Sequence, residues 1–271
     1  MNGSAIGVFD SGLGGLTCVK QLMSRLPNEN IIYFGDTARV PYGNRSVKTI
    51  TRYASQAIDF LLSKNVKLLI DACGTMSSSL ERDYTESLPV PYINVINPAA
   101  AAAVKLSENM RIGVIATAAT IKSGAFERSI REIAPTVEIF SGSCPLFVPL
   151  VENGHVSPDD RLTRLAAEEY LNDFRNNGID TLILGCTHYP IISEIISTVM
   201  GKKVNLIDSG AEAAKYAISL LEKGDKQKGS LRVYISDNTI GFLDVASSFL
   251  GFVPDDVITI DLETLENGSN K

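Results

Sequence analysis

The chain contains no tryptophan, only two histidines and only four cysteines among its 271 residues. It also lacks any apolar run near the roughly 20 residues that a membrane-spanning helix needs. Its first residues, Met1-Asn2-Gly3-Ser4, lead directly into a strand-like segment without a hydrophobic leader. We therefore expect neither a signal peptide nor a membrane anchor, and no membrane partner.

Positive charge is in deficit as well. The sequence has 25 lysines and arginines against 31 aspartates and glutamates, which gives a net charge of -6. The basic residues are scattered, so the chain lacks the electrostatic footprint of a nucleic-acid-binding protein. Four widely separated cysteines do not form a dense disulfide framework, and thiols are normally kept reduced in the cytosol. We expect a cytoplasmic protein with no nucleic-acid partner.

What the sequence does contain is a duplication centred on two cysteines. Residues 68–75 and 182–188 are near-copies, in which a strand-like apolar run ends in Cys73 or Cys186 and then a threonine. Three further pairs keep the same order along the chain: 6–8 with 112–114, 40–41 with 148–149, and 93–97 with 204–208. Four pairs in one order predict two similar α/β units.

Short β-rich runs alternate with helical patterns, which is typical of parallel strands joined by helical crossovers. Residues 47–63, for example, have apolar positions with a period near 3.6, and Ser157-Pro158 is predicted to cap a helix and begin it. Strands are predicted at residues 6–9, 31–34, 68–70, 112–116, 137–140, 181–184, 204–207 and 231–235, and helices at 16–26, 47–63, 76–86, 158–176 and from 211 to 222.

The predicted fold class is therefore α/β, with two similar parallel-sheet domains related by pseudo-symmetry and an active site in the interdomain cleft. We place the first domain at residues 1–97 plus 210–271 and the second at residues 98–209. In open α/β sheets, ligands bind outside the carboxyl ends of the strands. The residues that follow predicted strands at this end include Asp10, Ser11, Cys73, Thr117 and Cys186.

The paired cysteines favour acid–base chemistry. A thiolate on one side of a substrate removes a proton while a thiol on the other side donates one, which inverts a stereocentre without a cofactor. Asp10 and His188 are predicted to tune the thiols. Glu152 suits two interpretations equally: a partner that fixes the charge or tautomer of His188, or an ordinary surface glutamate. A single cysteine at such a turn is often only a small core residue, but the duplication favours function.

Other interpretations stay open. Cys186 and His188 suit a nucleophile and base for amide hydrolysis, or two of the four ligands of a structural zinc ion. The glycine-rich residues 12–15 suit a phosphate loop or a turn that binds a carboxylate, although Thr17 replaces the third glycine of a dinucleotide fingerprint. Residues 40–43 suit ligand binding or a packed turn. Three residues are given no chemistry: Cys18, Cys144 and His155.

Four stretches carry a resemblance to a known family: residues 7–15, 33–43, 72–73 and 184–190. On these stretches the chain resembles the glutamate racemases of the aspartate/glutamate racemase superfamily, over essentially its whole length. The resemblance implies cofactor-independent interconversion of L- and D-glutamate, which supplies D-glutamate for bacterial peptidoglycan. It also implies homodimers, a small-molecule substrate, no cofactor and no metal.

By position, the resemblance makes Cys73 and Cys186 the acid–base thiols, with Asp10 and His188 as their assistants. It does not by itself separate glutamate from aspartate as the substrate. The residues assigned to substrate binding are Asp10, Ser11, Pro41, Tyr42, Gly43, Gly74, Thr75, Thr117, Thr120, Glu152, Thr187 and His188.

One short segment departs from the family pattern. Gly74 stands where the family has asparagine, and Met76 is bulkier than the family's alanine. A lost hydrogen bond to a charged ligand costs about 1.5–3 kcal/mol, which is roughly tenfold to a hundredfold in affinity. The alternatives are therefore a racemase of aspartate, or a non-catalytic relative that binds an amino acid or another protein.

Overall fold

The computed structural model describes residues 4–221, 228–238 and 241–261, and its strands form two sheets. Sheet A has the order β10-β9-β2-β1-β3-β4 and sheet B the order β6-β5-β7-β8, with every neighbouring pair parallel. The strands are β1 Ile6–Asp10, β2 Ile31–Gly35, β3 Leu68–Asp71, β4 Tyr92–Asn94, β5 Arg111–Ala116, β6 Glu138–Ser143, β7 Thr181–Leu184, β8 Asn205–Asp208, β9 Leu231–Ile235 and β10 Val257–Thr259.

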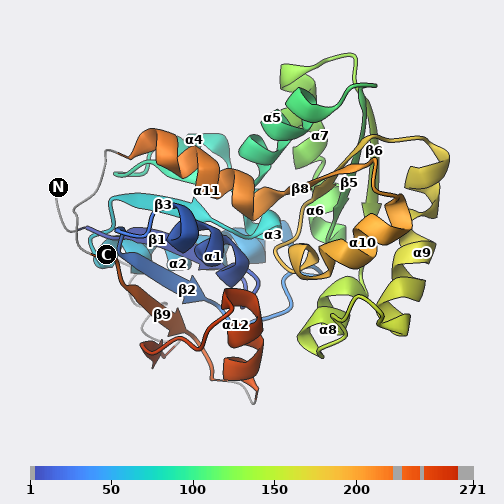
Figure 1. Ribbon diagram of the computed structural model, residues 1–271. Coiled ribbons are helices and arrows are strands. Elements are labelled where there is room, and N and C mark those ends of the chain that lie inside the picture. The colour runs from blue at the N-terminus through green and yellow to red at the C-terminus, as the bar shows by residue number, and fades with distance from the viewer. Residues whose placement is uncertain (1–3, 222–227, 239–240, 262–271) are drawn as a thin grey trace.

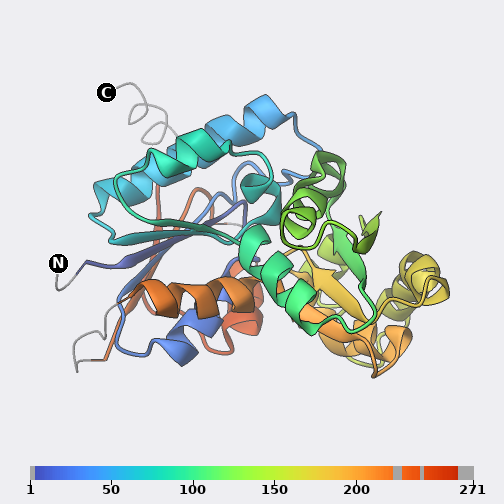
Figure 2. The ribbon, with the colours of Figure 1, turned by 90° about the horizontal axis from the view of Figure 1, so that it is seen from above.

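Helices cover both faces of each sheet, so the molecule has two α/β lobes lying side by side (Figures 1 and 2). In the first lobe, α2 covers one face of sheet A while α1 and α11 pack together on the other (Figure 2). In the second lobe, α5 packs on α7, and α9 packs on α10. The helices are α1 Leu16–Arg25, α2 Val47–Ser63, α3 Gly74–Ser77, α4 Arg82–Glu86, α5 Ile96–Leu106, α6 Ala118–Ser123, α7 Ala125–Ile133, α8 Phe147–Glu152, α9 Arg161–Asn176, η1 Tyr189–Ile192, α10 Ser193–Met200, α11 Ser209–Leu220 and α12 Phe242–Leu250.

The two sheets repeat one topology, which confirms the predicted pseudo-symmetric α/β fold. The order β2-β1-β3-β4 in sheet A matches β6-β5-β7-β8 in sheet B, with β9 and β10 added beyond β2. The registers match too, because Gly7 pairs with Leu69 and Gly113 pairs with Leu182. The predicted domain limits, 1–97 plus 210–271 and 98–209, stay a prediction.

The predicted strands and the predicted helix at residues 47–63 are present, and their burial explains why. All residues of β1 and β3 are buried, because helices cover both faces of sheet A. Helix α2 buries the apolar stripe that includes Ile50, Ala54 and Leu61, and the Ser46 side chain accepts a hydrogen bond from the Thr49 N–H to cap its first turn.

The single helix predicted at residues 76–86 is wrong, since α3 and α4 are separate short helices. After the first turn, the hydroxyls of Ser78 and Ser79 both donate to the Thr75 carbonyl oxygen, at 3.0 and 2.9 Å. Such local side-chain bonds compete with continuation of a helix. The chain therefore leaves the helical path before α4 begins at Arg82.

The predicted helix start at Ser157-Pro158 is also wrong. Helix α9 begins at Arg161, because the side chain of Asp160 accepts a hydrogen bond from the Thr163 N–H at 2.9 Å. Aspartate is as good an N-cap as serine, so the later of two suitable caps begins the helix. The helix predicted from 211 to 222 is α11, which ends at Leu220, and Glu222 lies outside the described residues.

The weakest of the four sequence pairs does not share a conformation. Val40-Pro41 lies in a loop after β2, whereas Val148-Pro149 lies inside α8, a helix that was not predicted. Pro149 is tolerated in α8 because a first-turn residue has no intrahelical partner for its N–H. In the part of the chain that the structure describes, no helix combines the length and the apolar character needed to cross a membrane.

Candidate active site

The two cysteine-bearing turns touch each other at the junction between the lobes. The Thr75 hydroxyl on α3 lies 2.9 Å from the Thr117 hydroxyl and 3.3 Å from the Thr120 hydroxyl of the second lobe. A Cβ atom built on Gly74 would lie only 2.3 Å from the carbonyl oxygen of Gly185. The lobes are therefore closed upon each other at a position that has no room for a side chain.

Cys73 follows β3 and is 5% exposed at this junction. Its backbone N–H donates to Asp71 Oδ1 at 3.0 Å, and its thiol donates to Ser11 Oγ at 3.4 Å. Burial raises the pKa of the Cys73 thiol, and the carboxylates of Asp10 and Asp71 raise it further. Cys73 thus lies in surroundings that favour the protonated thiol.

Cys186 follows β7 and lies beside a charged histidine. Its Sγ is 3.9 Å from Nδ1 of His188, whose Nε2 is 3.0 Å from Oε1 of Glu152 on α8. Burial of His188 opposes its charged form, but the bonds to Cys186 and Glu152 outweigh burial and raise its pKa to about 10. The predicted pairing of Glu152 with His188 is present, so the chain Cys186–His188–Glu152 joins β7 to α8.

Asp10 joins the two lobes from the end of β1. Its Oδ1 accepts a hydrogen bond from the Gly12 N–H at 2.8 Å, and its Oδ2 accepts one from the Thr187 hydroxyl at 3.4 Å. Burial raises the pKa of Asp10, while the nearby charge of His188 lowers it. A buried carboxylate therefore lies between the two thiol-bearing turns.

The glycine-rich loop serves the contact between the lobes. A Cβ atom at Gly14 would lie 2.1 Å from Thr187 Oγ1, so only glycine permits this approach. Thr17, which stands in place of a fingerprint glycine, donates through its hydroxyl to the carbonyl oxygens of Gly14 at 2.8 Å and Thr187 at 3.1 Å. Thr17 had no predicted role, and its proximity to the second lobe cannot be seen in a local motif.

The loop after β2 gives its three predicted site residues different surroundings. The Tyr42 hydroxyl donates to the buried carboxylate of Asp36, which also forms an ion pair with Arg39 at 2.7 Å. Gly43 faces the second lobe, and a Cβ atom there would lie 3.4 Å from Thr117 Cβ. Pro41 is exposed. Tyr42 thus holds the loop through Asp36, a residue that the sequence matched but to which no role was assigned.

Asp71 is a second functional candidate that sequence reasoning missed. It is 0% exposed at the end of β3, and its carboxylate accepts bonds from the Cys73 N–H and, at 3.0 Å, from the Tyr92 hydroxyl. The available signal was an acidic residue inside an otherwise apolar strand. The other copy of the duplication has Leu184 there.

The three residues to which no chemistry was assigned have structural surroundings. Cys18 is buried and its thiol donates to the Gly210 carbonyl at 3.4 Å, Cys144 is buried, and His155 pairs with Asp160 at 2.9 Å. Within residues 4–221, 228–238 and 241–261, no group of three or more His, Cys, Asp or Glu side chains is arranged to hold a metal ion.

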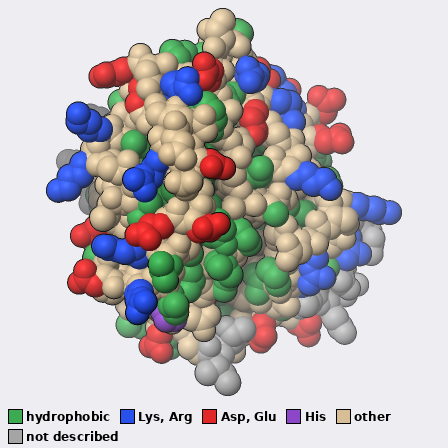
Figure 3. All heavy atoms as spheres, turned by 90° about the vertical axis from the view of Figure 1, so that its right-hand side faces the viewer, with side chains coloured by type: hydrophobic (Ala, Val, Ile, Leu, Met, Phe, Trp, Pro, Cys, Tyr) green, Lys and Arg blue, Asp and Glu red, His purple; other side chains and the backbone are tan. Residues whose placement is uncertain are grey.

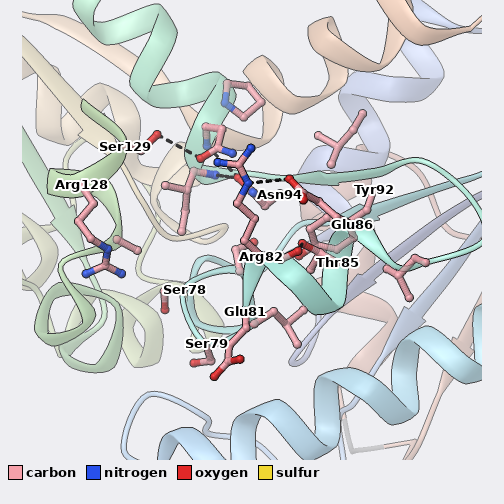
Figure 4. A pocket seen from close by; sticks show the side chains of 18 of the residues that line it. Ser78, Ser79, Glu81, Arg82, Thr85, Glu86, Tyr92, Asn94, Arg128 and Ser129 are labelled. Atoms are coloured by element: carbon pink, nitrogen blue, oxygen red, sulfur yellow. Dashed lines mark hydrogen bonds and ion pairs between the residues drawn. The ribbon is translucent and has the colours of Figure 1, made fainter. Parts of the chain in front are cut away.

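A groove of about 1260 Å³ opens elsewhere between the lobes (Figure 4). Arg82 and Tyr92 line it from the first lobe, and Arg128 lines it from α7 of the second. Its lining includes neither Cys73 nor Cys186. The groove and the thiol site are therefore different places in the molecule.

Two lobes of one strand order, each with a thiol at the carboxyl end of the matching strand, define a pseudosymmetric α/β protein with a paired-thiol junction. The family model described as Asp/Glu/Hydantoin racemase matches residues 15–217. A glutamate racemase of Syntrophus aciditrophicus is 47% identical, covering 91% of this chain and 92% of the relative, and that of Geobacter metallireducens is 42% identical, covering 96% and 97%. The chain belongs to the Asp/Glu/Hydantoin racemase family, and within it to the glutamate racemases.

A solved structure agrees with this assignment. The glutamate racemase from Francisella tularensis, crystallised in complex with D-glutamate, is similar to this chain with a TM-score of 0.90 and 41% sequence identity. The match covers 97% of this chain and 100% of that one. The likeness therefore includes both lobes and the junction between them.

Proposed function

We propose that this chain is an amino-acid racemase that interconverts L- and D-glutamate without a cofactor, using Cys73 and Cys186 as its two acid–base groups. The observation that carries the proposal is the presence of one thiol at the same strand end of each pseudosymmetric lobe, with the two turns in contact. The relatives support the substrate, since they are glutamate racemases and one was solved with D-glutamate bound.

The surroundings of the two thiols supply opposite halves of the reaction. The Cys186 thiolate beside the His188 cation removes the Cα proton from one face of the substrate, and the Cys73 thiol delivers a proton to the other face. The product then leaves with inverted configuration, and Cys73 is left as the thiolate. The opposite enantiomer reverses both transfers, so no proton is gained or lost by the protein over a complete cycle.

Substrate binding replaces contacts that now join the lobes. The hydroxyls of Thr75, Thr117 and Thr120 form a cluster at the junction, and hydroxyl donors of this kind suit a carboxylate. Glutamate enters when the lobes separate, and the lobes then close again with Gly74 against Gly185, so that the thiols lie on either side of the substrate. Asp10, next to Thr187, is available to the substrate's ammonium group once that contact opens.

Three broader properties are part of the proposal. The product D-glutamate is used for bacterial peptidoglycan, in keeping with the resemblance. The protein acts in the cytoplasm, where reduced thiols persist, and the four cysteines are all free. The chain forms homodimers, for which exposed leucines on and beside α9 are suitable: Leu146, Leu162 and Leu165. Hydrophobic side chains gather in the lower part of the face shown in Figure 3. Light scattering that finds only monomers would contradict the dimer.

The proposal is tested by incubating each glutamate enantiomer with the protein in heavy water. Product carrying deuterium at Cα, with unreacted substrate largely unlabelled, is expected of two separate thiols. Cys73→Ser and Cys186→Ser should each lower the rate by at least a hundredfold, because serine is a far weaker acid and nucleophile. Cys18→Ser is the matched control, since Cys18 is a buried thiol whose hydrogen bond to Gly210 serine can also make.

The same variants separate the alternatives. A Cys73→Ser protein that keeps its activity would favour hydrolysis by Cys186 and His188, while two inactive variants and an inactive wild type would favour a binding protein. Aspartate is assayed in parallel at equal concentration. Faster racemisation of aspartate than of glutamate would overturn the substrate assignment and leave the two-thiol mechanism in place.

A further inference from the structure

The two copies of the duplication differ at one buried position beside the thiols. In sheet A, Asp71 pairs with Phe9, and in sheet B, Leu184 pairs with Ile115 at the equivalent register. Each lies two residues before its cysteine. A carboxylate therefore lies behind Cys73 where the second lobe has only an apolar side chain.

The Asp71 carboxylate is held firmly in this place. It is 0% exposed, its Oδ1 accepts a bond from the Cys73 N–H at 3.0 Å, and its Oδ2 accepts one from the Tyr92 hydroxyl at 3.0 Å. Tyr92 comes from β4 and lines the groove of Figure 4. Burial raises the pKa of Asp71 well above its ordinary value, and the bonds from Tyr92 and Cys73 offset only part of this rise. Both carboxylate oxygens are satisfied, so Asp71 is fixed relative to the Cys73 turn.

Two acidic side chains on opposite faces of sheet A raise the pKa of the same thiol, that of Cys73. Side chains alternate along a strand, so Asp10 lies on the face of Val8, and Asp71 lies on the face of Leu69 and Phe9. Five titratable groups among the described residues interact electrostatically with Cys73: Asp10, Tyr33, Tyr42, Asp71 and Tyr92. All of these groups are acidic or phenolic, in contrast to the imidazolium beside Cys186.

We propose that Asp71 is a positioning residue for the reaction: its carboxyl group, held behind the Cys73 turn, helps the Cys73 thiol to keep its proton, so that Cys73 enters the reaction as the proton donor. This inference rests on the proposed two-thiol racemisation. Asp71 and Cys73 together keep one proton to a higher pH than an isolated thiol would. As the pH rises, kcat/KM falls when Cys73 loses its proton. Asp71 should move this fall to a higher pH than a thiol without a neighbouring carboxyl group would show.

The test is the Asp71→Asn variant, which keeps the size of the side chain and an acceptor for the Cys73 N–H. The protein is pulsed with iodoacetamide over a series of pH values, and labelling of the Cys73 peptide is read by mass spectrometry, because only the thiolate reacts. We expect the midpoint of labelling to move to lower pH by about one unit or more, the effect of removing a neighbouring charge. The alkaline limb of kcat/KM should move by the same amount, with the acid limb in place.

Two further variants complete the test. Tyr92→Phe removes one donor from the carboxylate and should produce a smaller shift in the same direction, which keeps the inference testable if Asp71→Asn does not fold. Asp208→Asn is the matched control, because Asp208 is a half-buried acid at the carboxyl end of β8 and its neighbouring thiol is Cys18. It should leave the Cys73 midpoint unchanged.

An unchanged midpoint in both Asp71→Asn and Tyr92→Phe would overturn the inference, as would an equal shift in Asp208→Asn. Labelling of Cys73 does not require the protein to turn over a substrate. The experiment can therefore contradict the role of Asp71 without contradicting the proposed racemisation, and the reverse. If the wild type does not racemise glutamate and the Cys73 midpoint still shifts, the proposed function falls while the influence of Asp71 on the thiol is upheld.

Discussion

The contact between Gly74 and Gly185 leads to a sharp prediction for the Gly74→Ala variant. The new methyl group would lie 2.3 Å from a backbone carbonyl oxygen, about 1.1 Å short of the distance at which ordinary contact begins. A backbone oxygen cannot rotate aside as a side chain can. The lobes of the variant must therefore stay apart by about an ångström at the place where the two cysteine-bearing turns meet.

The expected cost follows from the geometry of proton transfer. Misplacement by about 1 Å of groups that must act on one carbon lowers the rate by roughly a hundredfold. We expect kcat/KM of Gly74→Ala to fall by about this factor, measured by circular dichroism on L- and D-glutamate. Because the equilibrium constant between mirror images is one, kcat/KM must fall equally in both directions, which provides an internal check.

Gly74→Asn adds an amide to the same steric demand. Its hydrogen bond to a charged substrate is worth about 1.5–3 kcal/mol, so Asn should recover part of the activity that Ala loses. Gly12→Ala is the control, since its methyl would lie 3.1 Å from Cγ1 of the exposed Val40 side chain, which can move aside. If Gly74→Ala matches the wild type while its melting temperature is unchanged, the contact is absent from the reacting state and the reasoning fails.

Two predictions concern stability. Asp36→Asn removes the anion from a buried ion pair, since the side chains of Asp36 and Arg39 are 0% and 9% exposed. We expect the free energy of unfolding, measured by urea denaturation, to fall by about 3–5 kcal/mol. A fall of less than about 1 kcal/mol would contradict this prediction. The pKa of His188 in the folded protein is about 10, above its ordinary 6.5, so its stabilising contribution is complete below about pH 6.5 and is lost as the pH rises through 10. The melting temperature should therefore fall more steeply over this range in the wild type than in His188→Gln, and equal slopes would exclude this role.

The repeated fold could be predicted from the sequence because its signals are local. The apolar runs around Cys73 and Cys186, read with the pairs before and after them, give the strands and their common order. The fully buried strands β1 and β3 carry an apolar pattern that does not depend on distant partners. The pairing of Glu152 with His188 could be suggested from the sequence, because both residues lie near recognisable segments of the second unit.

The unpredicted features depend on where distant residues meet. A role for Asp71 can be recognised only in the folded sheet, where the register of β3 with β4 brings the Tyr92 hydroxyl to the Asp71 carboxylate. Thr17 looks like an ordinary helix residue until the second lobe places the Thr187 carbonyl 3.1 Å from its hydroxyl. The start of α9 is a different case, since Ser157 and Asp160 are both suitable caps and their local propensities do not choose between them.

The pairing of β9 with β2 has a consequence for the order in which the chain matures during synthesis. Ile31 is paired with Leu231, so the outer side of β2 waits for a partner that the ribosome makes much later. Sheet B, by contrast, uses strands from one continuous stretch of chain and has all of them available earlier. A nascent chain that folds as it is made should thus complete the lobe of sheet B before that of sheet A, leaving β2 as an open edge until β9 has been synthesised.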